Sequence, residues 1–277
     1  MKGVPRLFVC AMAAALAGAV SGSLVWAQAE PDAQIVPFSD PSRPGKIEVE
    51  LLSGAITVRG ENRRDVAIVM RQRPEKPSVQ ASAPPGLRRL QQVAGFEVSE
   101  ERNEIKIEGS SFRRSGSLEL RVPQRTNLEL NTVNDGTITV ENVEGEIEIE
   151  NVNGPVVLTN VAGSVVANSV NGGVTARLTR VMADKAMAFT SFNGPVDVTL
   201  PATIKANLRM RSDQGEIFTD FDVQLRPAPA PAANAPRGRD GKYRVEVNRA
   251  IYGAVNGGGP EIELRTFNGP VYLRKGQ

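Results

Sequence analysis

The residues of this chain that could do chemistry are carboxylates in two short runs. Glu146, Glu148 and Glu150 alternate with aliphatic residues, so they share one outward face of a predicted strand. Asp220 and Asp222 alternate in the same way. A glutamate face can bind a cation or a basic partner, or it can simply be solvated and neutralised by nearby basic residues. Paired aspartates can act as acid and base in polysaccharide cleavage.

Composition excludes most other catalytic chemistry. The 277 residues include no histidine, one cysteine, Cys10, and one tryptophan, Trp26. Ser-His-Asp and Cys-His catalysis therefore lack their base, and a zinc site has no imidazole to use. Sugar-cleaving sites also favour aromatic platforms, which are scarce here. We expect no catalytic residue, no cofactor and no metal, with an enzyme using Asp220 and Asp222 as the alternative.

The first 29 residues have the pattern of a signal peptide. Lys2 and Arg6 precede an apolar stretch, and Ala27-Gln28-Ala29 supplies a small-x-small cleavage site. A membrane anchor is the alternative interpretation. Cleavage would remove Cys10, so the remaining chain would be exported, to the periplasm or outside the cell, without a disulfide.

Charge and hydropathy limit the partners of the mature chain. Without Lys2 and Arg6, 31 basic residues balance 31 acidic ones. A chain of zero formal charge has no long-range field that attracts nucleic acid. No later stretch is apolar enough to predict a membrane span. We therefore expect an envelope or extracellular protein or glycan as the partner, not nucleic acid.

A glycine recurs every nine residues in the middle of the chain, at Gly136, Gly145, Gly154, Gly163 and Gly172. After each of the first four glycines, the third, fifth and eighth positions are aliphatic. The eighth position is Val143, Val152, Val161 and Val170. Alternation of apolar and polar residues is typical of a strand with one buried face. We expect glycine to supply the unusual backbone angles of a tight corner.

Asparagines add a second regularity to this repeat. The seventh position holds Asn142, Asn151 and Asn160, and Asn153 and Asn171 precede glycines eighteen residues apart. The natural unit is thus eighteen residues, with two strands and two corners. Stacked units would align identical side chains about 4.8 Å apart. The sequence predicts an all-β, parallel β-solenoid with about 18–22 residues per coil, in which aliphatic columns form the core and polar ladders satisfy the corners.

Two other interpretations of the repeat remain open. Asn-Gly is a strong hairpin signal, so an antiparallel meander is possible, although a meander would mirror the register at each turn. Calcium-binding β-rolls also use nine-residue units, but they place aspartate at each corner. The corners here hold no column of aspartate, which favours an amide ladder of Asn153 and Asn171.

The remaining sequence predicts one domain over residues 30–277 with two insertions. Residues 71–95 are polar and contain proline, and residues 224–242 include a Pro-Ala run. Such composition favours extended tethers over a packed core. Peptide or partner recognition by the Pro-Ala run is the alternative interpretation.

The repeated units "VNGPVVLTNVAG", "VNGGVTARL" and "FNGPVDVTLP" resemble the bacterial family called domain of unknown function 4097, which carries an adhesin label. The resemblance covers about residues 105–275, with a weaker match back to Lys46. It implies a secreted β-solenoid and no catalytic residues. Together, the resemblance and the composition predict an exported, non-enzymatic β-solenoid with an adhesin-like binding role or a structural role at the cell envelope.

Overall fold

The computed structural model describes residues 33–72, 96–109, 116–134, 136–182, 184–228 and 250–276. The described residues all belong to one compact unit, residues 32–277. The predicted signal peptide lies outside them, as does most of both predicted insertions. Of the insertions, 71–72 belong to strand β3 and 224–226 form strand β16.

Successive coils of the repeat run parallel and in register. In β8 (Ile138–Glu141), Ile138 lies opposite Val156 of β10 (Val156–Asn171), an offset of eighteen residues. Val156 in turn lies opposite Val174, and Val174 opposite Val196, where the offset grows to 22. The predicted parallel β-solenoid is therefore confirmed, and the antiparallel meander is excluded for the repeat.

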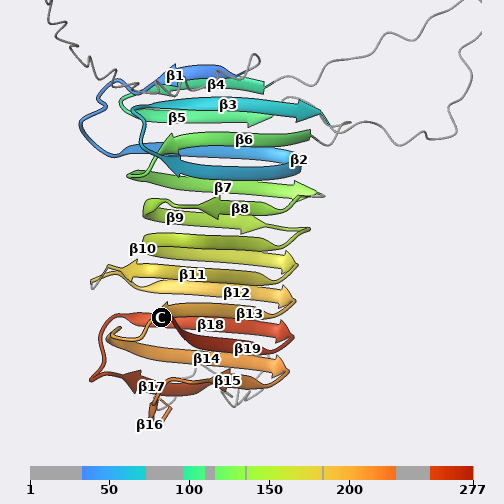
Figure 1. Ribbon diagram of the computed structural model, residues 1–277. Helices are drawn as coiled ribbons and strands as arrows, with labels where there is room; N and C mark the ends of the chain where they lie inside the picture. Colours follow the sequence, from blue (N-terminus) through green and yellow to red (C-terminus); the bar gives the residue numbers. More distant parts are fainter. Residues whose placement is uncertain are drawn as a thin grey trace, which may run out of the picture. The chain divides into compact units, whose positions relative to one another are not determined.

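Each coil contributes one strand to each of two layers (Figure 1). In spatial order, the first layer contains β5 (Glu104–Gly109), the first half of β2 (Gly45–Glu61), β7 (Thr126–Asn134), β9 (Glu144–Asn151), the second half of β10, β12 (Met187–Asn193), β18 (Glu261–Asn268) and β14 (Ala206–Gln214). The second layer contains β6 (Gly116–Pro123), the second half of β2, β8, the first half of β10, β11 (Val174–Val181), β13 (Val196–Pro201), β19 (Val271–Gly276) and β15 (Ile217–Thr219).

The spatial order of the coils departs from chain order at both ends. The coil formed by β2 lies between β5/β6 and β7/β8, although it precedes both in the sequence. Likewise, β18/β19 lies between β12/β13 and β14/β15 (Figure 1). The coil that comes last in the sequence therefore lies inside the stack and not at its end.

Antiparallel strands cover the ends of the stack. At one end β4 (Phe96–Glu101) pairs with β5, β3 (Asp65–Gln72) pairs with β6, and β1 (Gln34–Pro37) pairs with β3. At the other end β17 (Ile251–Val255) pairs with β14, and β16 (Gln224–Arg226) pairs with β17. These strands satisfy backbone groups that an open solenoid end would leave unpaired.

The core lies between the two layers and consists of aligned aliphatic columns. In one column Ala167, Phe189 and Leu264 are neighbours in register, and each is fully buried. The columns arise because strand side chains alternate between faces and successive coils keep the same register. Phe189 is the largest fully buried side chain among the described residues.

The eighth position of the repeat does not form one buried column, contrary to the sequence prediction. Val143 and Val161 are buried, but Val152 is 36% exposed and Val170 is 43% exposed. Each coil has two corners, which differ: at the first corner the chain passes from the first layer to the second, and at the second corner it returns to the first layer. At the second corner, Asn142 (φ 58°) adopts a left-handed conformation. This conformation shifts the alternation of the side chains and turns the next residue inward. The first corner, leading from the first layer to the second, lacks this shift, so its valines face outward.

Glycine is required at the corners mainly because neighbouring coils come very close. Gly163 has a left-handed φ of 124°, as predicted for a tight corner. Gly136 has no such angle, yet a Cβ built on it would lie 1.8 Å from the carbonyl oxygen of Gly54 in the adjacent coil. The sequence prediction, which invoked backbone angles alone, therefore omitted this steric reason.

Candidate functional site

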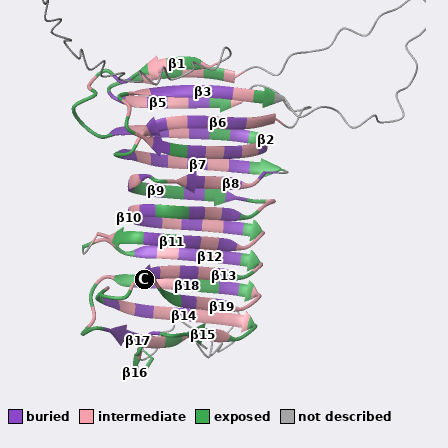
Figure 2. Cartoon of the chain, in the orientation of Figure 1, coloured by how far each residue is buried: buried purple, intermediate pink, exposed green. Residues whose placement is uncertain are grey.

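Six exposed apolar residues form a line along the first corner, one in each of six consecutive coils. We call this line the apolar ladder; in spatial order it consists of Leu52, Val133, Val152, Val170, Phe192 and Phe267. Their exposed fractions range from 36% for Val152 to 50% for Phe192. Figure 2 shows the exposed residues at the strand ends where β7, β10 and β12 reach this corner.

The apolar ladder faces outward because the residue before each member faces inward. Small polar side chains at that position donate hydrogen bonds to glycine carbonyls of the adjacent coil: Asn151 to Gly136 (2.8 Å), Ser169 to Gly154 (3.0 Å), Ser191 to Gly172 (2.8 Å) and Thr266 to Gly194 (2.8 Å). Alternation then directs the next side chain to solvent. Sequence reasoning missed the ladder; its signal is the recurring order of small polar residue, Val or Phe, Asn and Gly.

A ladder of asparagine amides runs beside the apolar ladder. Asn171 donates to Asn153 (2.8 Å), Asn193 to Asn171 (2.8 Å) and Asn268 to Asn193 (2.8 Å), and Asn153 donates to Asn134 (3.4 Å). The three asparagines of the seventh position do not form one ladder. Asn160 donates to Asn142 at the second corner, whereas Asn151 is buried at the first corner. The amide ladder links successive coils while leaving polar groups at the surface.

A hollow of about 450 Å³ lies along the apolar ladder. Val170, Phe192 and Phe267 contribute its apolar surface, and Thr190 and Arg265 contribute polar groups. The rings of Phe192 and Phe267 stack in parallel, with centroids 4.9 Å apart and an interplanar angle of 2°. Stacked rings are held rigidly, so the hollow has a preformed apolar side that a partner could contact without ordering it first.

The predicted glutamate face lies on the outward side of β9. Glu146, Glu148 and Glu150 are all exposed, and Glu146 forms an ion pair with Lys185. In β2, which β7 separates from β9, Lys46 forms ion pairs with Glu129 (2.8 Å) and Glu104 (3.0 Å), which raise the pKa of Lys46 above its usual value. Basic residues of nearby segments thus compensate part of the acidic surface.

The two aspartates of the enzyme alternative are surface residues, and Asp220 lies near Arg274. Asp220 accepts a hydrogen bond from the backbone N–H of Lys275 (2.7 Å). Asp220 and Asp222 are exposed, and neither lines the hollow beside the apolar ladder or the hollow described next.

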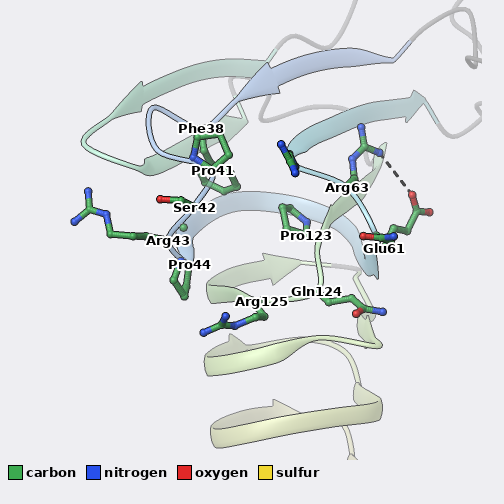
Figure 3. A pocket seen from close by; sticks show the side chains of 13 residues that line it. Phe38, Pro41, Ser42, Arg43, Pro44, Glu61, Arg63, Pro123, Gln124 and Arg125 are labelled. Carbon is green, nitrogen blue, oxygen red and sulfur yellow. Dashed lines mark ion pairs between the residues drawn. The ribbon is translucent and has the colours of Figure 1, made fainter.

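A second hollow, of about 240 Å³, lies near the end of the stack that β1 covers. Phe38 and four arginines line it. The three arginines that Figure 3 labels do not converge. Arg63 is directed to Glu61, whereas Arg43 and Arg125 point to the opposite side. This arrangement lacks the focused positive charge that an anion site requires.

Within the described ranges, no group of three His, Cys, Asp or Glu side chains is arranged to hold a metal ion. The same ranges contain no helix with the length and hydropathy of a membrane span.

Asn151 allows a test of the first-corner hydrogen bonds. Asn151→Ala should lower the free energy of unfolding by about 1–3 kcal/mol, because the buried carbonyl of Gly136 loses its partner. Asn151→Ser should stay within about 0.5 kcal/mol of the wild type, because Ser169 makes the equivalent bond and serine lacks the buried, unpaired Oδ1 of Asn151. Denaturant unfolding monitored by circular dichroism measures both changes. Equal destabilisation by both variants would contradict this role.

Comparison with known proteins gives a family and two structural likenesses. The model of the Toastrack family, DUF4097, matches residues 41–228. A candidate cell adhesion protein from Clostridium sporogenes is 9% identical, with 89% of this chain and 100% of that chain covered and a TM-score of 0.42. A candidate adhesin from Bacteroides fragilis is 8% identical, with 88% and 95% covered and a TM-score of 0.27. No curated protein matches the chain.

Proposed function

The chain belongs to the Toastrack family, DUF4097, and on this premise we propose that it is an exported, non-enzymatic β-solenoid that binds a partner at the cell envelope. The apolar ladder is the observation that carries this proposal. Soluble monomeric proteins rarely leave long contiguous apolar surfaces exposed, and those that do so commonly bind other molecules there. The signal-peptide pattern of residues 1–29 supports export.

The corner surface supports binding better than catalysis. It combines an apolar line, a polar amide ladder and a preformed hollow, which is the composition of an interface with an apolar centre and a polar rim. The described hollow beside it contains no carboxylate pair with an acid–base geometry. A purely structural role, in which the solenoid acts as a stable spacer, is the outcome if this surface binds nothing.

Capture from an envelope extract tests the binding role. The full chain is expressed with its own leader, purified, immobilised and incubated with envelope extract from cells that make the protein. We expect wild-type protein to retain a defined component and Val170→Asp to retain at least about tenfold less, because an unpaired charge at the centre of an apolar contact is costly to desolvate.

Thr159→Asp is the matched control, since Thr159 lies on the same long strand but is exposed on the second layer. It should retain as much as the wild type. Capture that Val170→Asp leaves unchanged, or no capture above the bare matrix, would refute a binding role for the apolar ladder. Recovery of the chain from the periplasm or medium tests its export.

A further inference from the structure

A second column of outward residues lies beside the apolar ladder, two residues earlier in each strand. In spatial order it reads Glu108, Glu50, Asn131, Glu150, Asn168, Thr190, Arg265 and Arg211. We call it the charged column. Its acidic residues all lie toward one end and its basic residues all lie at the other. Glu50 and Arg265 are exposed, and the Glu50 carboxylate lies near Lys106, whose pKa it helps to raise.

A column with this order of charges is complementary to a second copy of the same column that runs in the opposite direction. Consider two copies that meet at the first corner, related by a two-fold axis that lies in the contact plane, crosses the ladder and passes between Val152 and Val170. Each charged column then faces the other in reverse order. Glu50 of each copy faces Arg265 of the other, and the remaining positions pair a polar residue with a polar residue or with Glu150. Glu108 faces Arg211, although each already has an ion-pair partner in its own chain, Lys106 and Asp213 respectively. No like charges meet.

The same axis places the whole apolar ladder in the contact. Leu52 faces Phe267, Val133 faces Phe192, and Val152 faces Val170 across the two copies. All six exposed apolar side chains are then covered, with the amide ladders along one side and the charged columns along the other. A parallel arrangement, with the axis along the ladder, would instead set charged columns against amide ladders and lose the charge pairing.

The size of the surface sets the expected strength of the contact. Six coils at about 4.8 Å span about 24 Å, and the three neighbouring columns, which lie within four consecutive residues of each strand, span about 10 Å. The strip itself therefore covers roughly 250 Å² on each copy, or about 500 Å² in total, which is below the size of a standard specific interface. The contact therefore suits a weak and reversible association.

We propose that the partner of the apolar ladder is a second copy of this chain, bound in the antiparallel arrangement that sets Glu50 against Arg265. This inference rests on the proposed function, because it names the partner that the corner surface binds. An exported protein that associates through this surface would link copies of itself at the envelope.

Charge reversal tests the arrangement. Sedimentation equilibrium of the purified full-chain product should show a monomer–dimer equilibrium for the wild type. Glu50→Arg and Arg265→Glu should each weaken dimerisation about tenfold, because the two-fold symmetry turns two attractive pairs into repulsive pairs at once. The double variant should regain an affinity within about threefold of the wild type, since attraction is restored with opposite sign. Circular dichroism confirms that each variant is folded.

Several outcomes would overturn the proposal. The proposal is wrong if the wild-type protein remains monomeric at millimolar concentration. It is also wrong if the double variant dimerises no more tightly than either single variant. Mass spectrometry of the component captured from envelope extract separates this inference from the proposed function. Ladder-dependent capture of a different molecule would sustain the binding role and reject self-association, whereas a dimer that Val170→Asp leaves intact would reject the ladder as its interface.

Discussion

Gly136→Ala is expected to lower the free energy of unfolding by about 3 kcal/mol, the upper end of the usual cost of overpacking. The new Cβ would lie 1.8 Å from the carbonyl oxygen of Gly54 and 2.6 Å from its carbonyl carbon. Both are backbone atoms of the adjacent coil, and hydrogen bonds to β6 on one side and β8 on the other fix the spacing of that coil. No side-chain rotation can relieve the contact, so the coils must separate locally.

Gly116→Ala is the control for this effect. Among the described residues its Cβ would meet the carbonyl oxygen of Arg71 alone, at 3.3 Å, and Gly116 has no left-handed φ. We expect this variant to stay within about 1 kcal/mol of the wild type. Thermal or denaturant unfolding measures both variants. If the two glycines tolerate alanine equally well, close approach of the coils is not what requires glycine at the corners.

Phe189→Ala is expected to destabilise the fold by about 3–5 kcal/mol. Phe189 is fully buried between Ala167 and Leu264 of its column. Ala167 is too small to fill the space that the ring leaves, and the parallel register prevents the neighbouring coils from moving closer together. A cavity therefore persists, and the variant loses both the burial of the ring and its contacts.

Phe192→Ala, three residues along the same strand, is the matched control. Its ring is 50% exposed and stacks on Phe267. Loss of that stack should cost about 0.5–1.5 kcal/mol. The ratio of the two effects, measured as shifts in the midpoint of denaturant unfolding, distinguishes a core phenylalanine from a surface one. Similar costs for both rings would contradict the assignment of the apolar ladder to the surface.

These expectations separate stability from binding in this fold. The inward columns and the corner glycines hold the coils together, whereas the apolar ladder, the amide ladder and the charged column lie outside the core. Substitutions such as Val170→Asp should therefore change association while leaving the protein folded, which makes the binding surface accessible to experiment.

The nine-residue glycine period determined the architecture from sequence alone. Strand alternation fixes which residues share a face, and an unchanged register from Ile138 to Val156 is possible only when the coils run parallel. The same period could not reveal which corner residues face solvent. Val143 and Val152 occupy the same position of the repeat, but the left-handed backbone of Asn142 turns one inward, and the inward hydrogen bond of Asn151 leaves the other outside.

Only the tertiary structure decided the order of the coils and the surface that this order creates. Backbone hydrogen bonds between parallel strands are nearly the same for any two coils, so the sequence repeat does not say that β18 lies between β12 and β14. That placement brings Phe267 next to Phe192 and Arg265 into the column that begins with Glu108 and Glu50. Residues more than two hundred positions apart thereby form one surface, because each coil contacts its neighbours in the stack, and these need not be its neighbours along the chain.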